Sequence, residues 1–419
     1  MKQTKQSISL VKQIEKSPCI PLPEKKNTEL DNILAHLHND LQDAYLYLQD
    51  NPPQYKITVH EIENVKQIPY PKMFPASSFP FEVREHINIT SSRIVTYNVK
   101  YYERDITFHF VTEELHTPSV KKCIQYSQNM LAWLFIVNQY AKSWCAKKLV
   151  TYIYFTHMKK NLPTNSIHVI GELHANTAFT TTCPMTSEIV IFRMEEWFKV
   201  FIHETFHNFA LDFSDMDNTE CHTKLLKLFP VNSDVNLYEA YTEFWAEIMN
   251  VCFSSYFALK NKNNINTFIT DFKEKISIEQ GYSVFQMVKI LAFMGMNYQS
   301  LYSKSKEAET LRTTLYRENT NILAYYVIKT ILLMNYKNLL SWCYQHNTSL
   351  LQFKKTSKNQ LLFCKFIREH YKSAQLLSII DCNENYMKQL SISKPKNKKA
   401  QLERLNLLHS MRMTVYELY

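Results

Sequence analysis

The stretch Phe201-Ile202-His203-Glu204-Thr205-Phe206-His207 places two histidines four residues apart with a glutamate between them, the pattern HExxH. Residues four apart on an α-helix project from the same face, so both imidazoles can reach one metal ion at about 2.0–2.1 Å. Glu204 lies off that face, where its carboxylate can hold a metal-bound water and accept its proton. The spacing predicts a zinc site, with His203 and His207 as ligands and Glu204 as the general base.

The helix that carries this motif is expected to be buried. It is predicted over 195–211, after an apolar strand at 188–193. Two histidines on a solvated helix are the alternative interpretation. Burial disfavours that alternative, because imidazoles and a carboxylate removed from water need partners, and a metal ion supplies them. Apolar side chains occupy most of the helix circumference: Trp197, Phe198, Val200, Phe201, Ile202, Phe206, Phe209 and Ala210.

A tetrahedral zinc ion held by two histidines and a water needs one more protein ligand. The candidates are Asp212, His222, Glu239 and Glu243. The longer pattern HExxHxxGxxH is excluded, since alanine stands at its glycine position and phenylalanine at its third ligand position. Asp212 follows His207 by five residues, so it is expected to bond to a ligand rather than to the ion.

Glu239 is the favoured third ligand. It belongs to a helix predicted over 235–257, and it shares a face of small and acidic residues with Thr242, Glu243, Ala246 and Asn250. Such a face lets this helix approach the metal helix closely, with Glu239 pointing at the ion and Glu243 one turn further on. Two solvated glutamates on an outer helix face are the alternative.

The motif HETFH, followed by Glu239-Ala240-Tyr241-Thr242-Glu243-Phe244-Trp245-Ala246, resembles the gluzincin branch of zinc metallopeptidases. The second gluzincin motif often reads EGxAEYxA, and its first glutamate is the third zinc ligand. The resemblance implies that His203, His207 and Glu239 bind zinc, that Glu204 is the base, and that Glu243 orients a ligand. It covers residues 188–250 and departs at Ala240, where glycine is usual. The string IVIFRMEEWFKVFIHETFHNFALDFS also resembles uncharacterised HExxH proteins of large DNA viruses.

The same resemblance implies two further features of a peptidase site. Gluzincins commonly have an edge strand that pairs with an extended substrate, and segment 173–181, with Asn176 and Ala178, is the candidate. An ordinary strand or loop is the alternative for that segment. They also use a tyrosine or histidine to stabilise the oxyanion. Four residues are candidates for this role: His222, Tyr282, Tyr325 and Tyr326.

Hydrophobic patterning predicts strands in the first half of the chain and helices in the second. Strands are expected within 55–114, with a hairpin of 94–101 and 105–111, then at 148–155 and across 167–181. Helices are expected at 28–49, 119–147, 264–277, 282–300, 304–316, 320–335 and 358–372. The prediction is an α+β, zincin-like fold in which the metal site lies between a strand-bearing N-terminal lobe and a helical C-terminal lobe.

Four stretches are expected along the chain: an N-terminal arm and helix (1–54), a strand-rich lobe ending in the HExxH helix (55–212), a helical lobe (213–390) and a basic tail (391–419). The 3 glycines and the lack of a GxGxxG string disfavour nucleotide-binding loops. The 9 cysteines form no CxxC pair, so neither a zinc ribbon nor a disulfide framework is expected. With no signal peptide or membrane span visible, a cytoplasmic protein is predicted, or one packaged into a virion.

The function predicted from the sequence is a zinc-dependent hydrolase, a metallopeptidase that acts on a peptide or protein through a zinc-bound water activated by Glu204. Two alternatives remain. One is a catalytically silent, zincin-fold structural or virion protein. The other is a basic protein that binds nucleic acid, since the net charge is +9, with incidental histidines. Glu204 favours the enzyme, because a structural metal site has no use for a free carboxylate beside an open coordination position.

Overall fold

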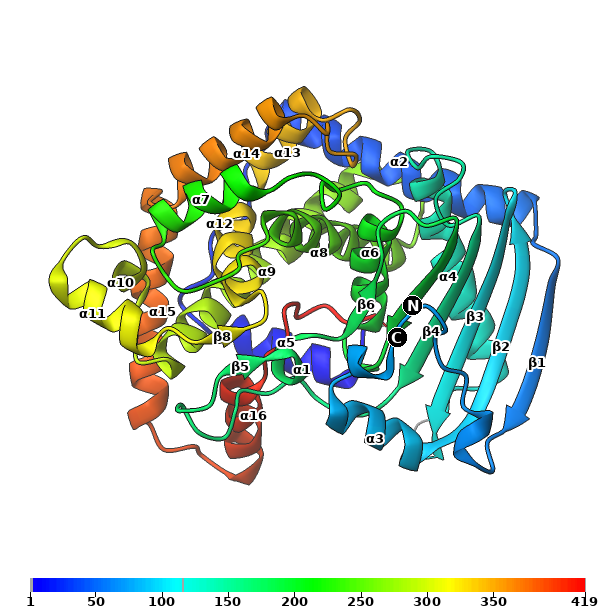
Figure 1. Ribbon diagram of the computed structural model, residues 1–419. Coiled ribbons are helices and arrows are strands. Elements are labelled where there is room, and N and C mark those ends of the chain that lie inside the picture. Colours follow the sequence, from blue (N-terminus) through cyan, green and yellow to red (C-terminus); the bar gives the residue numbers. More distant parts are fainter. Residues whose placement is uncertain (1–2, 115–116, 419) are drawn as a thin grey trace.

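A mixed sheet of six strands supports the helix that carries the HExxH motif in the computed structural model, which describes residues 3–114 and 117–418 (Figure 1). The strand order is β1-β2-β3-β4-β7-β6. Strands β3, β4 and β7 run parallel, and the other neighbours are antiparallel. The strands are β1 (Tyr55–Glu61), β2 (Ser91–Tyr101), β3 (Arg104–Glu113), β4 (Lys148–Phe155), β6 (Ala178–Thr180) and β7 (Thr186–Ile191), and β5 (Ile170–Gly171) pairs separately with β8 (Glu318–Asn319).

Both faces of the sheet are buried, because side chains alternate between them along each strand. Val95 and Phe110 face a large core, which they share with helices α4 (Val120–Asn138) and α6 (Trp197–Asn208). Their neighbours Ile94 and Val111 face a smaller core with helix α3 (Phe81–Thr90). The predicted hairpin is confirmed, since β2 and β3 pair up to Tyr101 opposite Arg104.

Helices and the loops between them form the rest of the described chain, and the helices of its second half lie beside the sheet (Figure 1). The remaining helices are α1 (Lys5–Ile14), α2 (Thr28–Asp50), η1 (Val65–Gln67), η2 (Ala76–Ser78), α5 (Glu172–Ala175), α7 (Thr219–Leu228), α8 (Leu237–Ala258), α9 (Ile265–Phe293), α10 (Tyr298–Tyr302), α11 (Lys306–Leu315), η4 (Leu323–Ile328), α12 (Lys329–Met334), α13 (Tyr336–His346), α14 (Ser357–His370), α15 (Ala374–Ile392) and α16 (Lys398–His409). The α+β class is thereby confirmed.

Four predicted elements differ from the structure. The helix expected over 119–147 ends at Asn138, and turns lead from there to β4. The extended segment expected over 167–181 contains the helix α5 and only two short strands. Two helices expected at 264–277 and 282–300 are one continuous helix, α9, that passes through Gly281. A Cβ atom at Gly281 would lie 3.3 Å from the Cα of Ile20, so glycine lets the N-terminal segment cross α9 closely.

The stretch 391–419, expected as a basic tail, forms α16 and then a buried segment at 410–418 (Figure 1). Two buried carboxylates accept hydrogen bonds from backbone N–H groups of this segment. Glu196 Oε1 accepts from the amides of Met413 (2.8 Å) and Thr414 (2.7 Å). Glu279 Oε1 accepts from the amides of Val415 (3.0 Å) and Tyr416 (3.1 Å). This segment therefore belongs to the interior beside α6 and α9, while the predicted domain boundaries stay a prediction.

The prediction of no disulfide framework is wrong. Two disulfides are present, Cys19–Cys382 and Cys145–Cys183. The paired cysteines lie 363 and 38 residues apart in the sequence, so no CxxC-like spacing indicates these disulfides. The second disulfide fixes the turn between β6 and β7 to the loop that precedes β4. Among the described residues, none of the helices combines the length and the apolar character that crossing a bilayer requires.

Candidate metal centre

The helix α6 carries the HExxH motif and is buried along its whole length, as the sequence predicts. It packs between the sheet and α8. Thr205 accepts a hydrogen bond from the indole N–H of Trp133 on α4 at 2.6 Å, both residues being fully buried. This contact ties α6 to α4, while His203 and His207 contact Glu239 on α8.

His203, His207 and Glu239 form a triangle of ligand atoms. The Nε2 atoms of the two histidines are 3.2 Å apart, and Glu239 Oε2 lies 3.2 Å from His203 Nε2 and 3.5 Å from His207 Nε2. Ligands that surround a tetrahedral zinc ion at about 2.0 Å are about 3.3 Å from one another. The three atoms therefore have the spacing of one face of a zinc coordination tetrahedron, and the two-nitrogen, one-oxygen donor set is one that zinc accepts.

The other ring nitrogen of each histidine is held by a carboxylate. His203 Nδ1 donates to Glu243 Oε2 at 3.0 Å, and His207 Nδ1 donates to Asp212. Asp212 also accepts from Thr242 Oγ1 at 3.2 Å. These bonds leave both Nε2 atoms directed at Glu239, and a carboxylate behind an imidazole makes it a stronger ligand. Asp212 and Glu243 thus contact the predicted ligands, as expected for residues that orient them.

A buried lysine, Lys199, completes this hydrogen-bond network. It lies one turn before His203 on α6, and its Nζ atom donates to Glu243 Oε1. Burial acts to lower the pKa of Lys199, but the adjacent carboxylates, Glu243 first, hold that pKa above its ordinary value. The ammonium group remains charged and compensates Glu243, which leaves Glu243 Oε2 available as an acceptor for His203.

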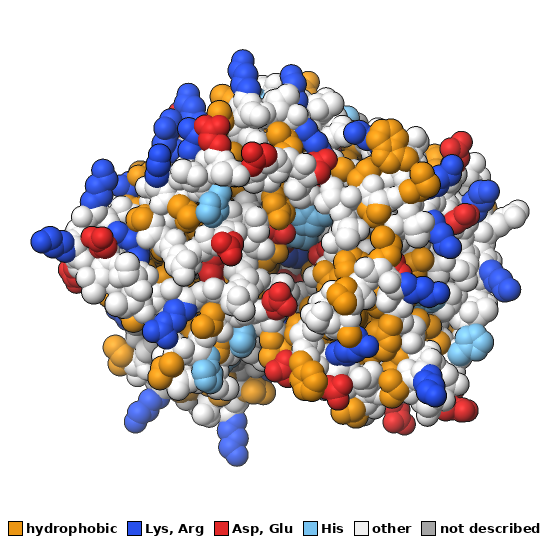
Figure 2. Space-filling view, viewed as in Figure 1, with side chains coloured by type: hydrophobic (Ala, Val, Ile, Leu, Met, Phe, Trp, Pro, Cys, Tyr) orange, Lys and Arg blue, Asp and Glu red, His pale blue; other side chains and the backbone are white. Residues whose placement is uncertain are grey.

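Glu204 is buried at the wall of a small pocket of about 40 Å³. Burial raises the pKa of its carboxyl to about 7, against the opposing effect of His203 and His207. A carboxyl with a pKa near neutrality is able both to accept and to release a proton. The same pocket is lined by His203, Glu243 and Tyr325. In the space-filling view, the surface is hollowed near its centre, and histidine and acidic side chains are visible at the bottom (Figure 2).

The predicted substrate segment also reaches this pocket. Asn176 and Ala178 line it, at the start of β6. Strand β6 is an edge of the sheet, paired only with β7 within the six-stranded sheet of the described chain. Its free edge is therefore available for a further extended chain, although the regular part of β6 comprises 3 residues.

The four predicted oxyanion donors have different positions. The Tyr325 hydroxyl donates to Glu239 Oε2 at 2.9 Å and so contacts the predicted third ligand. Tyr326 donates to the backbone oxygen of Met411, and the Tyr282 hydroxyl accepts from Gln286, so both are engaged in the core. His222 bonds to the backbone oxygen of Ser233 at 3.2 Å. The segment η4 is a π-helix, a wider turn that occurs often at functional sites, and it presents Tyr325 to the metal ligands.

Sequence reasoning missed three residues that line the pocket: Lys160, Lys199 and Met413. Lys199 carries a usable signal, because it stands four residues before His203 and hence on the same helix face. Lys160 and Met413 carry none, since one comes from a loop after β4 and the other from the buried segment at 410–418. Only the fold brings these two residues to the site.

Comparison with known proteins gives one partial match. A segment of 118 residues is 29% identical to an uncharacterized protein of Acanthamoeba polyphaga mimivirus. The match covers 28% of this chain and 29% of that protein's length. No protein-family model matches the chain. No solved structure matches it either. This chain is thus similar, over less than a third of its length, to a viral protein whose function is not described.

Proposed function

We propose that this chain is a zinc-dependent peptidase with a zincin-like arrangement, in which His203, His207 and Glu239 hold the ion. The ligand triangle carries the proposal, since its edges of 3.2, 3.2 and 3.5 Å are those of a tetrahedral zinc site. The buried Glu204 beside this triangle distinguishes a hydrolytic site from a structural one, which is usually closed by four protein ligands.

The residues of the chain have separate roles in this proposal. Zinc, when bound, would lower the pKa of a coordinated water and polarise the substrate carbonyl. The Glu204 carboxylate accepts a proton from the attacking water and then delivers it to the amine nitrogen that leaves when the peptide bond breaks. The Tyr325 hydroxyl turns from Glu239 to the substrate and donates to the carbonyl oxygen as negative charge develops there.

The substrate class follows from the edge strand. An extended peptide can add to the free edge of β6, where its backbone N–H and C=O groups replace water as hydrogen-bond partners. Asn176 and Ala178 lie at that edge and at the pocket wall, so an added chain would pass over Glu204. The pocket of about 40 Å³ suits a small side chain next to the cleaved bond better than a large one.

The test uses the full-length chain, zinc analysis and a peptide library read by mass spectrometry. Wild-type protein is expected to cleave peptides, and Glu204→Gln is expected to retain zinc while cleavage falls about 10²–10⁴-fold, the usual contribution of a general base. The matched control is Glu220→Gln, at an exposed glutamate on α7, which should cleave like wild type. Undiminished cleavage by Glu204→Gln would refute the mechanism. A zinc-loaded wild type that cleaves no library peptide would favour the catalytically silent alternative.

A further inference from the structure

A second group of histidine and glutamate side chains lies at the carboxyl ends of the two central strands of the sheet. Strands β3 and β4 are parallel neighbours, with Thr112 opposite Phe155, so their carboxyl ends meet at one place. Glu113 is the last residue of β3, and His157 follows β4 by two residues. His86 reaches the same place from α3, which covers the smaller core on the other side of the sheet from α6.

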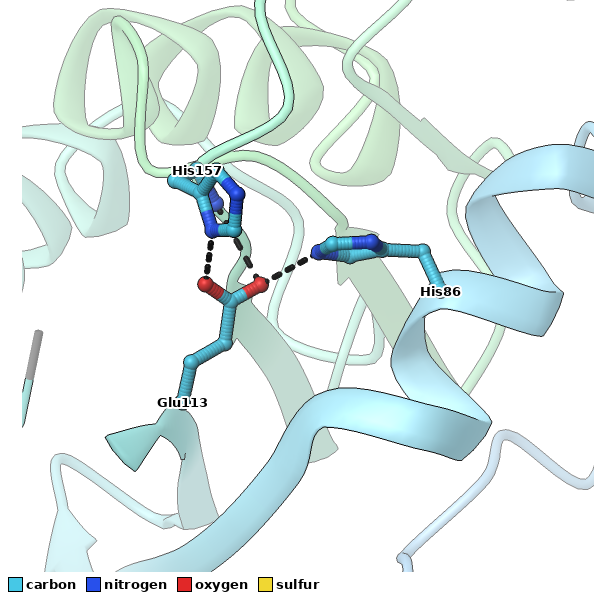
Figure 3. Close-up of side chains that lie close together, drawn as sticks. All are labelled: His86, Glu113 and His157. Carbon is cyan, nitrogen blue, oxygen red and sulfur yellow. Dashed lines mark hydrogen bonds and ion pairs between the residues drawn. The ribbon is translucent and has the colours of Figure 1, made fainter. Parts of the chain in front are cut away.

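The three side chains converge on the Glu113 carboxylate (Figure 3). His86 Nε2 bonds to Glu113 Oε1 at 2.6 Å, and His157 Nδ1 bonds to Glu113 Oε2. One ligand atom from each residue lies within 4.8 Å of the others. The carboxylate is 6% exposed, whereas His86 is 21% and His157 51% exposed. The group therefore combines a buried anionic oxygen with two imidazoles that are open to solvent on one side.

The charge of Glu113 has no permanent counter-ion in this arrangement. In the described part of the chain, its ion-pair partners within 4.0 Å are the two histidines, and no lysine or arginine nitrogen comes that close. A buried carboxylate that no lysine or arginine compensates is costly to hold in the fold, and a divalent cation bound there would compensate it.

We propose that His86, Glu113 and His157 form a second binding site for a divalent zinc ion, distinct from the HExxH site. Two imidazole nitrogens and one carboxylate oxygen are zinc ligands, and they disfavour Mg²⁺ and Ca²⁺, which prefer oxygen ligands alone. Solvent supplies the remaining coordination through the exposed side of His157. The ion would join α3 to the carboxyl ends of β3 and β4.

The experiment counts zinc ions per chain after equilibrium dialysis of the full-length protein against buffered Zn²⁺. Wild type is expected to bind two ions. The double variant His203→Ala/His207→Ala is expected to bind one, and adding His86→Ala and His157→Ala to it should remove that ion. Glu113→Gln preserves side-chain volume. Added to His203→Ala/His207→Ala, it should weaken binding of the remaining ion at least about tenfold. The adjacent exposed Glu114→Gln is the matched control and should bind as its parent does.

The outcomes separate this site from the proposed peptidase centre. If His203→Ala/His207→Ala binds no zinc while wild type binds one, the second site does not exist and the first one stands. If both proteins bind one ion that His86→Ala removes, the second site stands and the HExxH ligands are wrong. An ion that survives all four substitutions would contradict both assignments. Circular dichroism of each variant identifies any loss of fold, and Glu113→Gln supplies the answer if the alanine variants unfold.

Discussion

The two histidine clusters differ in how carboxylates bond to their imidazole nitrogens. At the HExxH site, Glu243 and Asp212 hold the outer ring nitrogens of the two histidines, and the inner nitrogens stand 3.2 Å apart, with Glu239 Oε2 at 3.2 and 3.5 Å from them. At the second cluster, the imidazoles bond directly to Glu113, with His86 at 2.6 Å. The first cluster has the spacing for an ion already, whereas the second must open to admit one. The two clusters therefore differ in preorganisation, the degree to which the ligand atoms already have the spacing that an ion requires.

Removing one histidine from each cluster in turn should give the largest difference in the rate of peptide cleavage. His207→Ala is expected to reduce peptide cleavage by more than about 10³-fold, because it removes a ligand of the ion on which the reaction depends. His157→Ala should leave the rate within about twofold of that of the wild type, since no residue of its cluster lines the pocket beside Glu204. Initial rates at saturating zinc measure both. Equal losses in the two variants would show that the clusters act as one site.

The Tyr325→Phe variant tests whether the first cluster is arranged for catalysis beyond metal binding. Loss of its hydroxyl should lower kcat about 10²-fold with little change in KM, because the O–H bond is needed when charge develops on the carbonyl oxygen. Zinc content should be unchanged. The control is Tyr344→Phe, at an exposed tyrosine on α13. A large rise in KM with unaltered kcat would assign Tyr325 to ground-state binding instead.

The carboxylates behind the first cluster should govern its affinity for zinc. Asp212→Asn is expected to weaken zinc binding about 10–100-fold, since His207 loses the charged acceptor that orients its ring. Competition with a chromophoric chelator gives the dissociation constant. Asp215→Asn, at a nearby exposed aspartate, should leave it unchanged. If Asp212→Asn binds zinc as tightly as wild type, the preorganisation described above contributes nothing to affinity.

Zinc should stabilise the fold through the second cluster by a small amount. In the His203→Ala/His207→Ala background, a hundredfold excess of zinc over its dissociation constant should raise Tm by about 3 °C, because the ion binds only the folded chain. The increment should disappear with His86→Ala. Differential scanning calorimetry measures it. A zinc-induced rise that persists without His86 would mean that the ion stabilises the chain elsewhere.

The sequence predicted most of the first cluster and none of the second, for a physical reason. His203, Glu204 and His207 share one helical turn, so their geometry follows from the period of the helix. Predicting Glu239 required one further inference, that a second helix approaches the first through its face of small residues. His86, Glu113 and His157 come from a helix, a strand end and a loop, and no spacing along the chain encodes their meeting.

The fold was predictable to a similar degree. The hairpin of β2 and β3 and the helix α2 follow local patterns and have the expected positions. The short elements α5 and β6, and the merging of two predicted helices into α9, depend on tertiary contacts such as the close passage of Ile20 over Gly281. The disulfides Cys19–Cys382 and Cys145–Cys183 were likewise invisible in the sequence, because their spacing reflects the fold alone.

The buried segment at 410–418 imposes an order on biosynthesis. Glu196, which precedes the first turn of α6, accepts the amide of Met413, a residue 217 positions later in the chain. At about 5–20 residues per second, a ribosome needs roughly 10–40 s to make that interval. Until then Glu196 lacks these partners beside the helix that carries both histidines. The nascent chain must therefore hold the Glu196 carboxylate without these two amide partners for tens of seconds.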